Sequence, residues 1–258
     1  MKEFRVWLKL TTNTFQQVLT NKFLMGLFLI AKLLRISLFL LFLHFLFQGT
    51  DNLAGYSKDQ IIFFYLSFNL VDSLSQTIFR EVYRFRELIL SGRLDFVLIK
   101  PINPLIRTLL GGSDLMDLFI LGLILSTTIW YGLKTDPTFL NWLLYLVLIL
   151  NSLLIAASFH IFVLGMGIIS TTVDHMIMVY RDLVSLGRIP VDLYIQPIRA
   201  ILTFVIPLGV MMTFPAKVLM GLLSPEYILI SILLSLTLFY LSLRFWGYSL
   251  KHYQSAGG

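Results

Sequence analysis

The chain has 258 residues, of which 57% are hydrophobic, 14% are aromatic and only 13% are charged. Soluble domains carry about 25% charged residues, so this chain lacks the polar residues that would cover a water-soluble surface. The same composition excludes a disordered chain, a collagen-like repeat and a coiled coil. The net charge is +6 and cysteine is absent, which excludes disulfides, thiol catalysis, iron–sulfur clusters and thiolate zinc sites. We therefore predict an all-α polytopic membrane protein, with room for about six spans of ~20 residues each.

The first 22 residues predict an amphipathic helix. Their apolar residues recur at near-helical spacing and can share one side: Phe4, Trp7, Leu8, Phe15, Val18 and Leu19. This pattern favours an N-terminal interfacial helix, residues 1–22, lying at the membrane surface. A cytosolic tail without fixed structure is the alternative.

Six apolar runs follow in chain order and predict the membrane spans. Their expected bounds are 23–47, 60–79, 114–133, 139–169, 198–223 and 227–248. The fourth run is long enough to tilt in the bilayer. A mixed segment, 170–196, precedes the fifth run, which Pro207 and Pro215 interrupt.

The distribution of lysine and arginine sets the expected orientation of these spans. With the N-terminus in the cytoplasm, fifteen basic residues fall on the cytoplasmic side: Lys2, Arg5, Lys9, Lys22, Arg80, Arg84, Arg86, Arg93, Lys100, Arg107, Arg181, Arg188, Arg199, Arg244 and Lys251. Only Lys58, Lys134 and Lys217 fall on the outer side. We therefore predict that both termini are cytoplasmic. Membrane topology then accounts for the basic composition, and we expect membrane lipids rather than nucleic acid as partners.

Motifs for catalysis are missing from the sequence. It contains no G-x-x-x-x-G-K-[ST] phosphate loop, no H-E-x-x-H motif and no G-x-S-x-G motif. The four histidines lie in different segments without the spacing of metal ligands. We expect no catalytic residue, no metal site and no bound cofactor in this chain.

Three charged residues lie inside the predicted spans, where each is costly unless it is paired or hydrated. Lys32 and Arg35 are three residues apart and share one helix face. Arg35 and Asp72 each lie 12 residues from the outer end of their span, which is about 18 Å at ~1.5 Å per residue. Antiparallel neighbours would bring Arg35 and Asp72 to matched depth. The pair can be a buried ion pair that fixes helix register or a contact for a substrate, and Lys32 can instead extend to the inner headgroups.

Residues 80–107 form a long charged segment between the second and third spans. Charged residues alternate there with apolar ones, Gly92 can break or cap a helix, and Pro101 and Pro104 end the segment. This pattern predicts a short, partly apolar cytosolic helix. It is suited either to docking on another protein or to resting on the membrane surface.

The run Gly92-x-x-Asp95-x-x-Leu98-x-x-Pro101, followed by Asn103-Pro104-Leu105, resembles a signature of permease subunits of type-2 ABC exporters. It is most similar to the branch whose permeases are encoded beside a separate ATPase. Further short motifs agree in order and spacing over essentially the whole chain: Gly55-Tyr56-Ser57, Arg80-x-x-Tyr83, Arg188-Ile189-Pro190, Ile206-Pro207, Phe214-Pro215 and Tyr253-Gln254-Ser255-Ala256-Gly257-Gly258.

This resemblance implies one half of a transporter in a prokaryotic cytoplasmic membrane. It implies a coupling helix in residues 80–107, with a re-entrant hairpin on the outer side at Pro207 and Pro215. Residues expected to contact or transmit force from the ATPase are Arg84, Arg86, Glu87, Gly92, Arg93, Asp95 and Pro101. The implied partners are two copies of an ATP-binding ABC subunit and a second permease, identical or related.

Two other classes of function stay open. An ion-gradient-driven secondary transporter would use Asp72, Asp114 and Asp117 as ion carriers. A membrane assembly protein would not transport at all. A neighbouring gene for an ATPase with a phosphate loop would favour the ABC permease over both.

Overall fold

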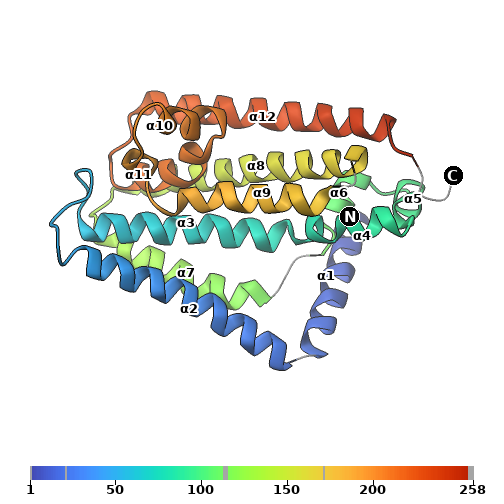
Figure 1. The fold of residues 1–258 in the computed structure, drawn as a ribbon, viewed down its shortest axis with the longest axis horizontal. Coiled ribbons are helices and arrows are strands. Elements are labelled where there is room, and N and C mark those ends of the chain that lie inside the picture. Colours follow the sequence, from blue (N-terminus) through green and yellow to red (C-terminus); the bar gives the residue numbers. More distant parts are fainter. Residues whose placement is uncertain (1, 21, 113–115, 171, 255–258) are drawn as a thin grey trace.

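The computed structural model describes residues 2–20, 22–112, 116–170 and 172–254. Within these ranges the chain is helical almost throughout, and the described part contains no strand beyond one isolated bridge between Leu53 and Tyr56. Figure 1 shows an elongated bundle of long helices. The N-terminal helix α1 (Lys2–Thr20), the short helices α4 to α6 and the last turn of α12 lie at one end, called here the terminal end. The predicted all-α polytopic fold is confirmed.

Four helices in the described ranges are long and apolar enough to cross a membrane: α2 (Lys22–Leu46), α3 (Lys58–Ile78), α8 (Phe139–Ser170) and α12 (Pro225–Lys251). The segments Ile198–Val205 and Gly209–Leu219 pass the same test together but are bent by 78°. Helix α7 (Met116–Leu133) is apolar and shorter. Each predicted apolar run thus corresponds to a helix or bent pair, and the count of six spans stays a prediction.

Helix α3 is the centre of the bundle. Fourteen of its 21 residues are buried, and it packs against α7 and α8. Ser57 caps its first turn through a capping box with Gln60, which satisfies backbone groups that would otherwise lie unpaired at the helix start. Helix α2, by contrast, leaves most of its apolar side chains exposed, so it presents a surface for lipid or for another protein chain.

Helices α8 and α12 pack along each other through small residues. The buried residues of α12 are serines apart from Trp246: Ser231, Ser235, Ser242 and Ser249. Ser235 and Asn151 of α8 share a hydrogen bond, and Asn151 also donates to the Ser231 carbonyl at 3.4 Å. Small and polar residues at a helix seam allow close approach in an apolar environment.

Segment 170–196, which was not among the predicted membrane spans, contains a helix that lines the functional site. Helix α9 (Val173–Ser185) folds back along α8 (Figure 1), and the following turn η2 (Leu186–Arg188) reaches α3. Its buried residues recur at helical spacing: Val173, Ile177, Tyr180 and Val184. Arg181 and Arg188, which the sequence analysis assigned to the cytoplasmic side, therefore lie away from the terminal end and beside the middle of α3.

A bent helical hairpin lies at the opposite end, called here the hairpin end (Figure 1). Its first arm consists of α10 (Ile198–Ala200) and η4 (Ile201–Val205), and its second of η5 (Gly209–Thr213) and α11 (Phe214–Leu219). Pro207 lies in the break between the arms. Pro215 lies instead in the first turn of α11, where the missing N–H of proline has no partner to lose.

One carboxylate ties this hairpin to the rest of the molecule. Asp192, in the turn η3 (Val191–Leu193), accepts hydrogen bonds from Tyr56 at 2.8 Å and from Lys217 at 3.0 Å, and it forms an ion pair with Arg199. Burial, followed by the hydrogen bond to the Asp192 carboxylate, raises the pKa of the Tyr56 phenol above its usual value. Asp192 thereby links the turn before α3 to both arms of the hairpin. Arg199, which the sequence analysis assigned to the cytoplasmic side, lies instead at the hairpin end with Lys217.

Candidate functional site

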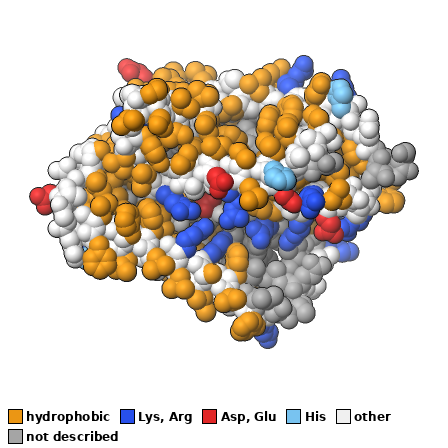
Figure 2. Space-filling view, in the orientation of Figure 1, with side chains coloured by type: hydrophobic (Ala, Val, Ile, Leu, Met, Phe, Trp, Pro, Cys, Tyr) orange, Lys and Arg blue, Asp and Glu red, His pale blue; other side chains and the backbone are white. Residues whose placement is uncertain are grey.

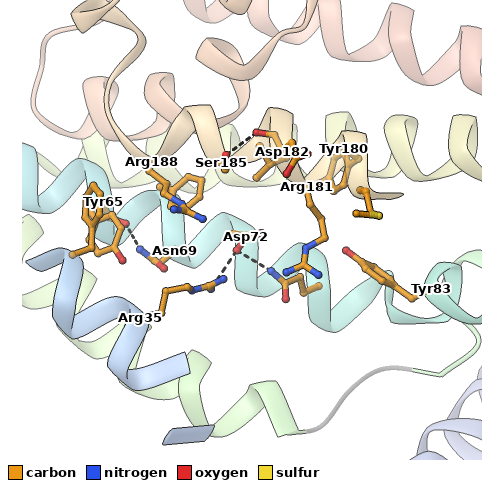
Figure 3. A pocket seen from close by; sticks show the side chains of 15 residues that line it. Arg35, Tyr65, Asn69, Asp72, Tyr83, Tyr180, Arg181, Asp182, Ser185 and Arg188 are labelled. Atoms are coloured by element: carbon orange, nitrogen blue, oxygen red, sulfur yellow. Dashed lines mark hydrogen bonds and ion pairs between the residues drawn. The ribbon is translucent and has the colours of Figure 1, made fainter. Parts of the chain in front are cut away.

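A cavity of about 300 Å³ opens between α2, α3 and α9 (Figure 3). Helix α3 contributes one polar stripe to it, formed by Tyr65, Asn69, Asp72 and Gln76. These positions follow one another at three- and four-residue steps and so lie on one helix face. The facing wall carries charged residues from three elements, namely Arg35 of α2, Arg181 and Asp182 of α9, and Arg188 of η2. We call this space the charged cavity.

The structure brings Arg35 and Asp72 together. Arg35 Nη2 lies 4.0 Å from Asp72 Oδ2, and Gln76 donates a hydrogen bond to the same oxygen at 2.8 Å. Asp72 is largely enclosed, whereas Arg35 is half-buried. The long ion-pair distance leaves the Arg35 guanidinium able to contact a further acceptor in the cavity.

A second cavity of about 280 Å³ adjoins the first and shares Arg35, Gln76 and Arg181 with it. It is also lined by Lys32 and Arg80. Lys32 Nζ lies 5.0 Å from the centroid of the Phe28 ring. The two cavities form one polar surface, with five basic side chains and two carboxylates, Asp72 and Asp182. Figure 2 shows a cluster of basic side chains on this face of the molecule, with hydrophobic side chains on several sides of it.

The 80–107 segment is built from several short helices rather than the single helix expected. The turn η1 (Arg80–Arg84) leads into α4 (Phe85–Leu90), and α5 (Arg93–Leu98) follows after a sharp turn. Gly92 makes that turn at φ +66°, a conformation that glycine adopts without steric cost. Helix α6 (Pro104–Leu110) then begins at Asn103, whose side chain accepts hydrogen bonds from the next backbone N–H groups.

Four of the predicted coupling residues form ion pairs at this end of the molecule, and Arg84 among them pairs with Glu81. Arg86 Nη1 lies 3.2 Å from Asp174 Oδ2, in the first turn of α9. Arg93 forms an ion pair with Glu87 and donates a hydrogen bond to Ser91 Oγ at 3.0 Å. The Arg86 contact joins the segment to α9, and the Arg93 contacts close the turn between α4 and α5.

Asp95 and Pro101 occupy the far side of the segment. Burial, followed by the influence of the neighbouring Asp95 carboxylate, raises the pKa of Tyr253 to about 12. Asp95 therefore lies beside the chain that follows α12. Pro101 is exposed in the turn between α5 and α6.

Glu81 is a residue that the sequence analysis did not single out. Its side chain is only 7% exposed, and its two carboxylate oxygens bind Arg84 at 3.2 Å and Arg107 at 2.6 Å. The segment's beginning and end are thus joined by a single carboxylate. Arg84 lies at the helical spacing of three residues and could have been inferred, whereas no local pattern links residues 81 and 107.

The outer surface of the segment is apolar at its tip. Val82, Phe85, Ile89, Leu94 and Val97 are buried against the bundle. Phe96 is 62% exposed and Ile99 is 78% exposed, and Leu90 is also exposed. A braced element with exposed apolar side chains is suited to contact with another protein surface.

Two of the three predicted ion carriers, Asp114 and Asp117, cannot be placed in the site. Asp114 and the side chain of Asp117 lie outside the described residues, as do residues 255–258 of the C-terminal motif. Among the residues that the structure describes, no group of three or more His, Asp or Glu side chains could hold a metal ion.

Long apolar helices beside a charged cavity are typical of a polytopic membrane protein. The family model described as "ABC-2 family transporter protein" matches residues 33–257, and the chain belongs to this family. The resemblance to type-2 ABC permease subunits is thereby confirmed. Searches of curated proteins and of solved structures found no match. The matched range includes the charged cavity and the whole 80–107 segment.

Proposed function

We propose that this chain is the permease subunit of an ATP-driven exporter and docks on a separate ATPase through the 80–107 segment. Membership of the ABC-2 family implies a membrane transport component that associates with an ATP-binding ABC subunit. The chain lacks a phosphate loop, so ATP is bound and hydrolysed by the partner.

The observation that carries the proposal is the physical link between the 80–107 segment and the charged cavity. Arg86 of the segment pairs with Asp174 at the start of α9, and Arg181 of α9 lines the cavity about two turns further along. Glu81 braces the segment from within. When a partner moves the exposed tip of the 80–107 segment, the first turn of α9 moves with it. The rest of α9 follows, because packed helices shift as units.

The location and assembly follow from the same reasoning. The terminal end carries most of the basic residues outside the cavity, so we place it in the cytoplasm and the hairpin end on the outer side of a prokaryotic cytoplasmic membrane. Helix α2, which lines the charged cavity, leaves its apolar surface exposed. A second permease, identical or related, would complete the pathway there, above two ATPase subunits.

The test is ATP hydrolysis by a candidate ABC ATPase subunit from the same organism, measured with and without the permease in nanodiscs. Phe96→Asp should abolish binding and stimulation of the ATPase, because it places a charge in the docking surface. Phe139→Asp is the matched control, since Phe139 is 84% exposed and begins α8 away from the segment. A carboxylate is tolerated in the first turn of a helix. Transport by the purified chain under an ion gradient, with no ATPase present, would contradict the proposal.

A further inference from the structure

The charged cavity holds more positive than negative charge at a depth where charge is costly. Counted along α3 at ~1.5 Å per residue, Tyr65 lies about 10 Å and Asp72 about 21 Å from the first residue of the helix. The cavity therefore occupies the middle of a membrane-spanning helix. Five basic side chains and two carboxylates line it and the adjoining cavity, which leaves a surplus of three positive charges.

Two of these arginines have no acceptor among the residues that the structure describes. Among the described residues, neither Arg181 nor Arg188 forms a hydrogen bond or an ion pair, although both line the cavity. Figure 3 shows them extending from α9 and η2 toward the α3 stripe, facing Arg35 across the space. Ionisable groups inside a membrane protein mark sites for ligands or ions unless they are paired. Guanidinium groups converging from three elements match the geometry of a phosphate.

Apolar surface continues directly from this charged group. Phe39 of α2 stacks on Tyr65 with ring centroids 4.3 Å apart, and Phe68 and Met178 complete the wall of the cavity. Beyond it, α2 exposes a row of large apolar side chains: Leu34, Leu38, Leu41, Phe42 and Phe45. Figure 2 shows a cluster of basic side chains with hydrophobic surface next to it. A free ion would contact only the charged part of this surface.

From this arrangement we propose that the charged cavity binds the anionic phosphate headgroup of an amphiphile, with Arg35, Arg181 and Arg188 as its ligands and the apolar tail along α2. That the bound amphiphile is also the transported molecule rests on the proposed function. That the cavity binds it does not depend on any ATPase. The chemistry defines the substrate class as phosphate-bearing lipids or lipid-linked molecules.

The test is lipid retention by the purified full-length permease, without ATPase, measured by native mass spectrometry in a neutral detergent. The probes are phosphatidic acid, phosphatidylcholine with the same acyl chains, and inorganic phosphate. We expect phosphatidic acid to bind at least tenfold more tightly than phosphatidylcholine. The double variant Arg181→Gln/Arg188→Gln should weaken phosphatidic acid binding about tenfold or more, because charge-assisted hydrogen bonds are lost. Asp182→Asn should tighten it, because it removes an exposed carboxylate from the cavity wall.

Arg244→Gln is the matched control, since Arg244 is an exposed arginine on α12 that lines neither cavity. It should leave all affinities unchanged. Equal retention of phosphatidic acid by the native chain and the double variant would overturn the proposal. Binding of inorganic phosphate as tight as that of phosphatidic acid would overturn the amphiphile assignment. Loss of the permease dimer in the double variant, with lipid affinity unchanged, would assign the arginines to a protein interface instead.

Discussion

Removing the Glu81 carboxylate is expected to destabilise the permease more than any other single change in the 80–107 segment. Glu81 is 7% exposed and Arg107, its closer partner, is 20% exposed. Truncating one member of a buried ion pair leaves the other charge uncompensated and costs about 3–5 kcal/mol. For a chain of this size, 1 kcal/mol changes the thermal midpoint by roughly 2–4 °C, so Glu81→Ala should lower the midpoint by roughly 10 °C. The measurement is thermal unfolding of the purified permease in one fixed detergent.

Glu87→Ala is the control for this experiment. Glu87 also pairs with an arginine of the same segment, but its side chain is 74% exposed, so its removal should cost only ~0–1 kcal/mol. The double variant Glu81→Ala/Arg107→Ala should be less destabilised than the sum of the single variants, because the two groups interact directly. If Glu81→Ala were as mild as Glu87→Ala, or if the double variant were strictly additive, the brace inferred from the structure would be refuted.

Three further predictions follow from other contacts. Gly92→Val forces a β-branched residue to φ +66°, which costs about 1–3 kcal/mol; it should lower ATPase stimulation in the coupled assay and leave membrane insertion intact, and normal coupling would count against the role of this turn. Asp95→Asn should lower the pKa of Tyr253 from about 12 toward 10, as measured by an absorbance titration corrected with Tyr253→Phe; in the native chain the Tyr253 contribution to stability is complete below pH 10.0 and is lost as the pH rises through about 12. Asp192→Ala should destabilise the hairpin by about 3–5 kcal/mol, because the partly buried Lys217 loses its carboxylate; proteolysis of the hairpin end that is no faster than in the native chain would contradict this.

Hydropathy alone predicted the long helices, because a bilayer demands continuous apolar runs and the chain supplies them. It missed α9 for the same reason. Asp174, Arg181 and Asp182 lower the mean hydropathy of that helix, yet its other face packs against α8 at regular helical spacing. The charges are tolerated because Arg181 and Asp182 line the charged cavity and Asp174 pairs with Arg86. The helical spacing of its apolar residues was the sequence signal that could have predicted α9.

The contact between Arg35 and Asp72 could be predicted, because the number of residues from the end of a span gives the depth of a side chain in the membrane. The contacts of Glu81 and Asp192 could not. Each joins residues far apart in the chain, so only the packed fold decides the partner. The break at Pro207 was visible as a proline inside an apolar run, whereas Pro215 has the same sequence signature and lies in a helix start. A proline alone does not distinguish these two positions.

The central claim, docking of a partner ATPase on the tip of the 80–107 segment, is tested most directly by single-cysteine cross-linking in membrane vesicles. The chain contains no cysteine, so Phe96→Cys and Phe139→Cys each introduce one unique thiol. We predict that Phe96→Cys cross-links to the ATPase and reacts with a membrane-impermeant maleimide only from the cytoplasmic side. Phe139→Cys should not cross-link to the ATPase and should not react from the cytoplasmic side. Labelling of Phe96→Cys from outside the cell, or its failure to cross-link to an ATPase that copurifies with the permease, would contradict the account.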